Sequence, residues 1–259
     1  SCTFHSQIWP AEMLAYAGAG NHGGEPGEYG TLNLPTQVVA SEFMTMEGRA
    51  FSTSRSHVIY VRDVIERYGP DPLRYFLSAN GPETHDADFS WPDFVQRNNA
   101  ELVGGWGNLV NRTATMIHKN VGHIPTPGEL EPVDEQILAT VRAAFAGVGD
   151  LIGRQRQRAA ISEAMSVVGE VNKYISATEP FKLKAPEQRE RLHTVLHVLA
   201  QAVSDLNRIL APFLPHAANR VHAVLGGTGE FMPMPRSERV KDIGDEPLDY
   251  LVITGDYQA

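Results

Sequence analysis

The sequence predicts an α-rich α/β fold in which a small mixed segment leads into a larger helical bundle. Before about residue 90 the segments are short and rich in Gly and Pro, and strand-like and helical stretches alternate. After that point apolar residues recur at spacings of three and four almost to the end, as in amphipathic helices. Four or five such helices joined by short loops predict an antiparallel bundle.

Size and composition set wide limits on function. The 259 residues suffice for one large domain or two ordinary ones. A formal charge of -9 argues against non-specific nucleic-acid binding but leaves room for a local basic face. The single cysteine, Cys2, excludes an internal disulfide and a multi-cysteine metal site. With no leader pattern and no apolar run of roughly 20 residues, we expect a cytoplasmic protein without a membrane role.

In the first segment, residues 21–30 contain four glycines and a proline, which predicts a loop. Residues 36–46 carry β-branched and aromatic residues and predict a strand. Residues 57–69 begin like a strand and become helical after Asp63, with Gly69 as the end of the helix.

The next helix starts are marked by capping residues and proline. A helix over residues 70–80 is predicted, with Asp71 as its cap and Pro72 in its first turn. Ser90 and Pro92 predict the start of a long helix that runs to about residue 120. Three glycines in that helix predict a kink or a close helix contact, because each costs roughly 1 kcal/mol relative to Ala. They are Gly104, Gly105 and Gly107.

Three further helices are predicted from apolar stripes, after a Pro/Gly loop over residues 121–132. The stripes are Ile137, Val141, Phe145, Val148 and Ile152; then Ile161, Met165, Val168 and Tyr174, ending before Pro180; then Leu192, Leu196, Leu199, Val203, Leu206 and Leu210. A shorter helix with Val221 and Leu225 ends at Gly226 and Gly227, and the tail contains a strand-like stretch, YLVITG. We expect this tail to pack back on the bundle.

Seven stretches occur in a characteristic order along nearly the whole chain. They are FHSQIWPAEMLAY, LNLPTQVVASEFMTMEGR, RYGPDPLRYFLSANGPETHDADFSW, DFVQRNNAELVGGWGNLVNRT, NKYISATEPF, ILAPFLPHAANRVHAVLG and ITGDY. Together they resemble methionyl-tRNA synthetases, which are class I aminoacyl-tRNA synthetases, in the form seen in actinobacteria. Each stretch is weak evidence alone, and their order makes the resemblance specific.

The resemblance implies four parts: a C-terminal remnant of a Rossmann catalytic domain (1–47), a KMSKS-like loop with a stem-contact segment (48–89), an anticodon-binding-like bundle (90–228) and a C-terminal tail (229–259). In the family, the HIGH motif and a zinc-bearing insertion precede the part matched here. We therefore expect the chain to need an N-terminal catalytic half, to hold no zinc and to be inactive alone.

The loop GRAFSTSRSH aligns with the family's KMSKS loop. Both lysine positions are lost, to Ala50 and Thr53. In that chemistry a carboxylate attacks the α-phosphorus of ATP, bound with Mg²⁺, and lysines meet the charge that develops on the phosphoryl groups. We expect the remaining contacts from Arg49, Ser52, Thr53, Ser54 and Arg55. Catalysis should be weakened, because a guanidinium fork does not replace an ammonium group. The alternative is a solvated loop without a role.

The stretch FHSQIWP resembles the family's methionine pocket. This implies that Phe4 and Trp9 form apolar walls and that His5 lines the pocket. A thioether packs well against aromatic rings, which suits such walls. From spacing alone, these residues would instead be ordinary core residues.

The stretch WGNLVNRT resembles the family's anticodon-reading helix. Asn108 and Arg112 lie four residues apart and therefore on one helix face, where they can contact base edges or phosphate. Phe181 occupies the position of a stacking Trp, and its ring can still stack on an unpaired base. From spacing alone, the Asn/Arg pair is surface decoration. His193 and His197 could grip a metal by spacing, but Thr194 stands where HExxH requires Glu, so we expect them to be structural.

These features predict part of a ligase that activates methionine or an analogue with ATP and transfers it to tRNA. One alternative is a tRNA-independent relative that activates an amino acid for a natural-product acceptor, such as a hydrazine synthetase that forms an N–N bond. The lost lysines, Phe181 and the acidic charge favour this alternative. A third possibility is a non-catalytic module that binds tRNA or a partner chain.

Overall fold

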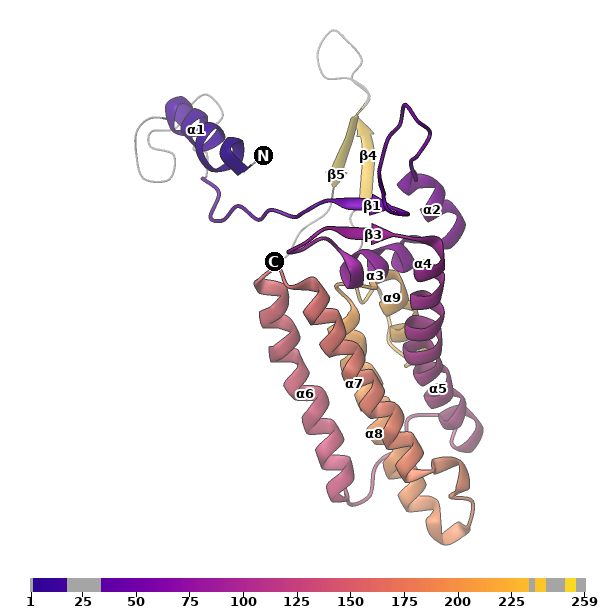
Figure 1. Cartoon of the computed structure of the whole chain (residues 1–259). Coiled ribbons are helices and arrows are strands. Elements are labelled where there is room, and N and C mark those ends of the chain that lie inside the picture. The colour runs from indigo at the N-terminus through magenta and orange to yellow at the C-terminus, as the bar shows by residue number, and fades with distance from the viewer. Residues whose placement is uncertain (1, 18–33, 233–235, 241–249, 255–259) are drawn as a thin grey trace.

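The computed structural model describes residues 2–17, 34–232, 236–240 and 250–254. Figure 1 shows a long helical bundle with a small sheet at one end and a short helical segment standing beside that sheet. The fold is α-rich with little strand, as the sequence predicts. The loop predicted over residues 21–30 lies outside the described residues.

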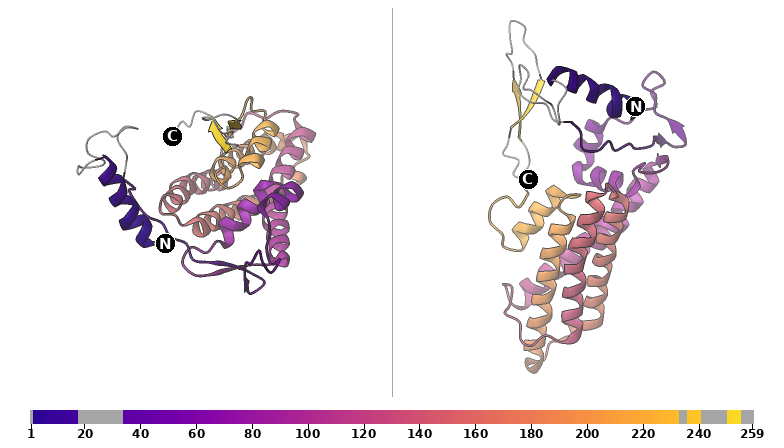
Figure 2. Two further views of the ribbon diagram at one scale, coloured as in Figure 1. Left: turned by 90° about the horizontal axis from the view of Figure 1, so that it is seen from above. Right: turned by 90° about the vertical axis from the view of Figure 1, so that its left-hand side faces the viewer.

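The first described segment is helical. A π-helical turn, η1 (Phe4–Ile8), runs into α1 (Trp9–Ala17). In all three views α1 stands apart from the bundle (Figures 1 and 2). A helix this short is marginal in water without packing, so its stability depends on what covers it.

The strand predicted over residues 36–46 is shorter than expected, because only β1 (Met44–Met46) pairs with neighbours. Residues before Met44 are held by single contacts: the Glu42 N–H donates to the Pro82 carbonyl (2.9 Å) and the Phe43 N–H to Asp86 Oδ1 (3.0 Å). β-Propensity alone does not make a strand where no partner strand lies alongside.

The sheet has the order β2-β1-β3. β1 pairs antiparallel with β2 (Arg49–Ala50) and parallel with β3 (Ala87–Phe89). The two residues that join β1 to β2 both have positive φ, Glu47 at 50° and Gly48 at 72°, as a tight hairpin turn requires.

Two helices lie between β2 and β3, α2 (Val61–Tyr68) and α3 (Pro70–Asn80). Gly69 ends α2 with a φ of 80°, which confirms the predicted helix end. The predicted capping role of Asp71 in its own helix is wrong, because Gly69 occupies the N-cap of α3. The Asp71 carboxylate instead accepts the backbone N–H groups of His216 (3.4 Å) and Ala217 (2.6 Å) in another helix.

The long helix predicted after Ser90 is present as three consecutive parts, α4 (Trp91–Arg97), the π-helix η2 (Asn98–Gly107) and α5 (Asn108–Asn120). Ser90 caps it by accepting the Asp93 N–H (3.3 Å), as predicted. The glycines lie in the π-helical part. A Cβ added at Gly105 would meet Met165 Cε at 3.4 Å, so this glycine permits the predicted close helix contact.

The rest of the bundle consists of α6 (Pro132–Gly153), α7 (Gln157–Thr178), α8 (Arg189–Leu210) and α9 (Pro215–Val224), with two short 3₁₀ turns, η3 (Pro180–Lys182) and η4 (Pro186–Gln188). Most predicted stripe residues are buried in one large core, and Leu192 and Leu196 lie in a smaller second cluster. Phe145 is the exception: it is 40% exposed, although Leu138 and Val141 beside it on the helix surface are buried. α6 is long and apolar enough to cross a membrane by composition, but its buried stripe packs within the bundle.

The end of the chain forms a two-stranded antiparallel ribbon, β4 (Arg236–Val240) and β5 (Tyr250–Thr254). The strand predicted from YLVITG is therefore confirmed. The end of α9 near Gly226, whose φ is 86°, is confirmed as well.

Asp134, at the start of α6, is the most deeply buried charged group among the described residues. It is fully buried and accepts hydrogen bonds from the Tyr174 hydroxyl (2.5 Å), the Arg191 guanidinium (3.0 Å) and the Glu131 N–H (2.9 Å). Burial opposes ionisation of Asp134, but the bonds from Arg191 and Tyr174 outweigh it and hold its pKa below the ordinary value. Burial and the same contact raise the pKa of Tyr174.

We predict that Asp134→Asn lowers the free energy of unfolding by about 3 kcal/mol, because it leaves the partly buried Arg191 with only the exposed Glu131 carboxylate (3.1 Å) as a partner charge. Asp150→Asn on the same helix breaks an exposed pair with Arg154 (3.1 Å) and should cost less than about 0.5 kcal/mol. Urea unfolding at neutral pH measures both.

The pH dependence follows from the direction of the shift. A lowered folded-state pKa stabilises the fold above the ordinary carboxyl pKa of about 3.9, and this contribution disappears as pH falls through the lowered value. The difference between wild type and Asp134→Asn should therefore shrink below about pH 4. A difference that is constant with pH would show that the Asp134 charge is not stabilising.

Candidate functional site

The candidate ATP loop is a hairpin that begins at β2 and returns at His57. Ser52 and His57 exchange both backbone hydrogen bonds at 2.9 Å, and the Ser56 N–H donates to the Thr53 carbonyl (3.1 Å). The His57 ring also bonds the Met46 carbonyl (2.9 Å), which fixes the returning strand to β1. The loop is therefore a closed turn with a defined base.

Most side chains of this loop face solvent. Arg49, Thr53, Ser54 and Arg55 are exposed, and Ser52 is half-buried. The hydroxyls of Ser52 and Ser54 lie 3.2 Å apart. Neither arginine makes a hydrogen bond or ion pair within the part of the chain that the structure describes. One turn thus carries both hydroxyl and guanidinium donors, and the charges of the two guanidinium groups have no partner among the described residues.

A carboxylate at the base of the hairpin holds its orientation. Asp88 in β3 accepts the Thr45 hydroxyl (2.5 Å) and the Gly48 N–H (2.9 Å) across the sheet. The bond from Thr45, and then that from Gly48, lower the pKa of Asp88. The carboxylate form therefore fastens the β1–β2 turn to β3 at neutral pH.

Polar side chains fasten the segment that carries the loop to the bundle, among them Asp71, Glu83 and Arg74. Asp71 caps α9 as described above, and the Glu83 carboxylate accepts the Arg158 N–H in the first turn of α7 (2.7 Å). Arg74 donates to the carbonyls of Pro212 (2.7 Å) and Phe213 (3.2 Å). Sequence analysis missed these contacts, because they join residues more than 70 positions apart and leave no local pattern.

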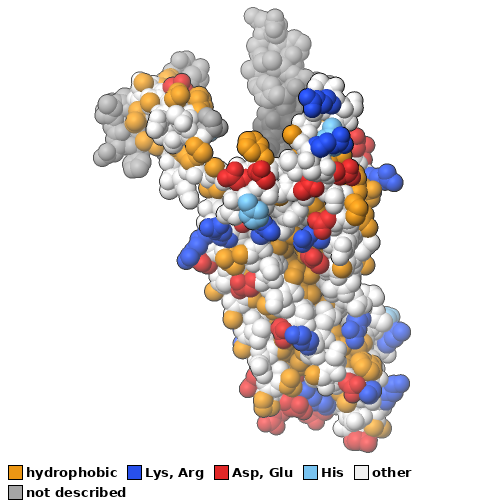
Figure 3. Space-filling view, in the orientation of Figure 1, with side chains coloured by type: hydrophobic (Ala, Val, Ile, Leu, Met, Phe, Trp, Pro, Cys, Tyr) orange, Lys and Arg blue, Asp and Glu red, His pale blue; other side chains and the backbone are white. Residues whose placement is uncertain are grey.

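The predicted methionine-pocket residues lie close together at the start of the chain. The rings of Phe4 and His5 are 5.4 Å apart and those of His5 and Trp9 are 6.4 Å apart. Phe4 is 42% and Trp9 is 40% exposed, so the alternative that they are core residues is wrong for this chain. His5 and Trp9 line an open cleft of about 540 Å³ with residues 35–43. Figure 3 shows apolar side chains gathered on this part of the surface.

The predicted tRNA-contacting residues lie along the bundle. Asn108 is exposed and Arg112 half-exposed on the regular helix α5, four residues apart. Phe181 is 48% exposed in η3, at the connection between α7 and α8. Leu183, two residues later, packs in the same cluster as Ile117 of α5, so Phe181 is brought to the end of the bundle where α5 finishes.

Of the two histidines considered as metal ligands, His193 and His197, the second has a structural contact. The ring of His197 bonds the Pro125 carbonyl (2.9 Å) and so fixes the loop before α6. Over residues 2–17 and 34–232, no group of three or more His, Cys, Asp or Glu side chains lies close enough to hold a metal ion.

Comparison with known protein families shows which kinds of domain the chain contains. A family model described as tRNA synthetases class I (M) matches residues 1–114, and a model described as the anticodon-binding domain of tRNA ligase matches residues 134–249. A remnant of a class I synthetase catalytic domain is therefore joined here to an anticodon-binding domain.

Individual relatives define the family. The methionine–tRNA ligase of Beutenbergia cavernae is 64% identical to this chain over 98% of its residues, and the matched region is 41% of that ligase. The methionine–tRNA ligase of Nocardioides sp. is 61% identical over 99% of this chain, and the matched region is 43% of that ligase. The methionyl-tRNA synthetase of Mycobacterium tuberculosis in complex with methionyl-adenylate superposes with a TM-score of 0.77 at 26% identity, over 89% of this chain and 43% of that one. The chain belongs to the methionyl-tRNA synthetase family and spans about two fifths of the length of these relatives.

Proposed function

We propose that this chain supplies the C-terminal part of a ligase that activates methionine or a close analogue with ATP and transfers it to tRNA in the cytoplasm. One observation carries the proposal: the chain matches methionine–tRNA ligases over nearly its whole length, loop and bundle included. The exposed hairpin and the polar face of α5 are the two surfaces that this activity would use.

The hairpin would contact the phosphates of ATP and its Mg²⁺ complex. Arg49 and Arg55 offer guanidinium groups that are free to form bidentate contacts with phosphate, and Ser52, Thr53 and Ser54 add hydroxyl donors. Contacts that strengthen as charge develops in the transition state would accelerate adenylate formation. The hairpin lacks the compact ammonium charge of a lysine, so its contribution is expected to be smaller than in relatives that retain one.

The bundle would choose the tRNA. Asn108 and Arg112 project from one helix, where an amide can read a base edge and a guanidinium can contact a base edge or phosphate. The exposed ring of Phe181 would stack on an unpaired base.

A complementary N-terminal catalytic half would complete the methionine pocket and the ATP site. Phe4, Trp9 and Phe43, the last 77% exposed, leave a large apolar surface open on and beside α1. Surfaces of this kind mark contacts with other protein surfaces. Without that half, the chain would not form adenylate.

One alternative is supported by specific residues. The replacement of both lysine positions by Ala50 and Thr53, together with Phe181 in place of Trp, favours a relative that activates an amino acid for a natural-product acceptor without tRNA. Hydrazine-forming N–N ligation belongs to this class. The third possibility is a non-catalytic module that binds tRNA or a partner chain. Such a module would use the polar face of α5 but would not need the hairpin.

Activation is tested by ATP–pyrophosphate exchange with each of the common amino acids. We expect no exchange from the chain alone, and methionine-dependent exchange when it is co-expressed with the N-terminal part of the Beutenbergia cavernae ligase that precedes the matched region. Ala50→Lys combined with Thr53→Lys should raise that rate roughly 100-fold, because each restored charge stabilises the transition state.

Ala139→Lys, at an exposed position on α6, is the matched control and should leave the exchange rate unchanged. Exchange with an amino acid other than methionine would favour the natural-product alternative. A folded complex without exchange, even with both lysines restored, would refute an adenylating role.

Recognition of tRNA is tested by filter binding with initiator tRNA at several salt concentrations. We expect Arg112→Gln to weaken binding roughly tenfold, whereas Arg142→Gln, on the exposed face of α6, should change it less than twofold. Equal effects of the two variants, or no salt-sensitive binding by the wild type, would contradict the proposed tRNA-binding face.

A further inference from the structure

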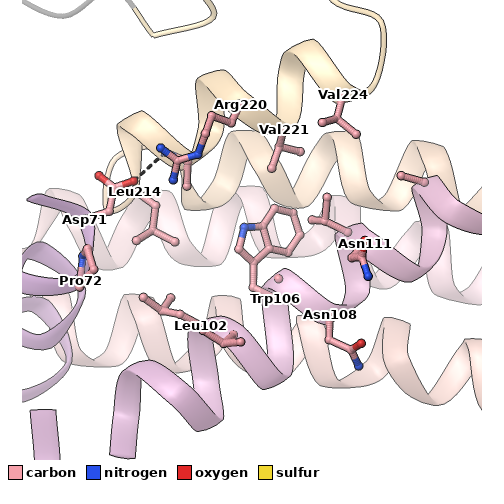
Figure 4. A pocket seen from close by; sticks show the side chains of 15 residues that line it. Asp71, Pro72, Leu102, Trp106, Asn108, Asn111, Leu214, Arg220, Val221 and Val224 are labelled. Atoms are coloured by element: carbon pink, nitrogen blue, oxygen red, sulfur yellow. Dashed lines mark hydrogen bonds between the residues drawn. The ribbon is translucent and has the colours of Figure 1, made fainter. Parts of the chain in front are cut away.

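A hollow of about 660 Å³ lies between the helix formed by η2 and α5 and the short helix α9. Its walls are mainly aliphatic and aromatic, formed by Leu102, Trp106, Val110, Ala114, Leu214 and Val221 (Figure 4). The volume is within the range of about 300–1,000 Å³ that is typical of small-molecule sites. Asn108, proposed above to contact tRNA, lies at the rim of the hollow, and the residues that form its apolar walls have none of the roles proposed above.

One donor lines the hollow without a protein partner. Trp106 is only 4% exposed, its indole N–H makes no hydrogen bond with any described residue, and its ring forms part of the wall of this open hollow. Figure 4 shows the indole across the middle of the hollow, with its nitrogen edge turned toward the end where Leu214 and Asp71 lie. A Trp N–H in a largely apolar site ordinarily finds an acceptor. A ligand with an acceptor at this position would supply the hydrogen bond that no described residue makes.

The polar groups at the rim do not add a net charge. The Asp71 carboxylate is occupied by the backbone N–H groups of His216 and Ala217, and the Arg220 side chain lies beside it. One negative and one positive group therefore offset each other at this end. At the other end, Asn108 and Asn111 contribute neutral amides. A charged ligand would lose hydration without gaining an unpaired counter-charge.

From these contacts we propose that the hollow is a binding site for a neutral, ring-sized apolar ligand that carries one hydrogen-bond acceptor. The apolar body lies among Leu102, Val110 and Val221, and the acceptor accepts a hydrogen bond from the Trp106 indole N–H. Nucleotides fit poorly, because their phosphates and ribose hydroxyls would face aliphatic walls. The inference does not depend on the proposed ligase activity.

The probes are quinoline, which has a single ring-nitrogen acceptor, and naphthalene, which has the same shape without it. The chain has three tryptophans, whose indole N–H resonances are resolved in a ¹H–¹⁵N NMR spectrum and assigned by single Trp→Phe variants. We expect quinoline to shift the Trp106 resonance saturably, and to bind about fivefold or more tightly than naphthalene, since one hydrogen bond is worth roughly 1 kcal/mol.

Two variants locate the effect. Trp106→Phe should reduce quinoline binding to the level of naphthalene, followed by the methyl resonances of Val110 and Val221. Ala114→Met should fill the hollow and abolish binding of both probes, while the thermal unfolding midpoint reports whether the variant is folded. AMP serves as the charged comparison and should not shift the Trp106 resonance.

The proposal is overturned if quinoline causes no saturable shift of Trp106 in the wild type. It is equally overturned if naphthalene binds as tightly as quinoline, or if AMP binds more tightly than either. A folded Ala114→Met variant that binds quinoline like the wild type would place the binding elsewhere and also overturn it.

Discussion

Two carboxylates of the loop-bearing segment cap the first turns of two bundle helices. Asp71 accepts N–H groups at the start of α9, and Glu83 accepts one at the start of α7. The first N–H groups of a helix have no partner within it and carry partial positive charge, so a carboxylate supplied from outside stabilises that end. Because the caps come from a different part of the chain, Asp71 in α3 and Glu83 just after it also fix the position of the loop-bearing segment against the bundle.

The rest of the arrangement builds on these caps. Arg74 adds donors to the carbonyls between α8 and α9, on the same side of α3 as Asp71. At the other end of α3, the Asn80 amide donates to the Asp88 carbonyl (3.0 Å), and the Asp88 carboxylate holds the turn from which the hairpin projects. A continuous series of polar contacts therefore leads from α9 to the hairpin. If the hairpin contacts ATP and the bundle contacts tRNA, as proposed, this series fixes the separation of the two sites.

Local sequence patterns predicted the helical part well. The stripes on α7 and α8, the Ser90 cap and the helix end at Gly69 depend on spacing and on the conformations of single residues, which the sequence states directly. The resemblance supplied the order of the two parts and the family. Even so, Phe145 follows the apolar spacing of α6 and remains 40% exposed, because spacing does not tell which face a neighbour covers.

The parts that sequence reasoning missed depend on long-range partners. Residues 36–43 have strand propensity without an adjacent strand, and Asp71 satisfies a helix that begins 144 positions later, at Pro215. The site residues could be named from the family motifs. Their surroundings, such as the internal bonds of the hairpin and the exposure of the aromatic residues near the start, required the coordinates.

These contacts should hold the hairpin-bearing segment and the bundle together as one rigid unit. A spin-label distance between Arg62→Cys on α2 and Ala139→Cys on α6, in a Cys2→Ser background, tests it most directly. We expect one narrow distance distribution, which broadens when Asp71→Ala and Glu83→Ala are introduced together. A broad distribution in the protein with both caps intact would contradict it.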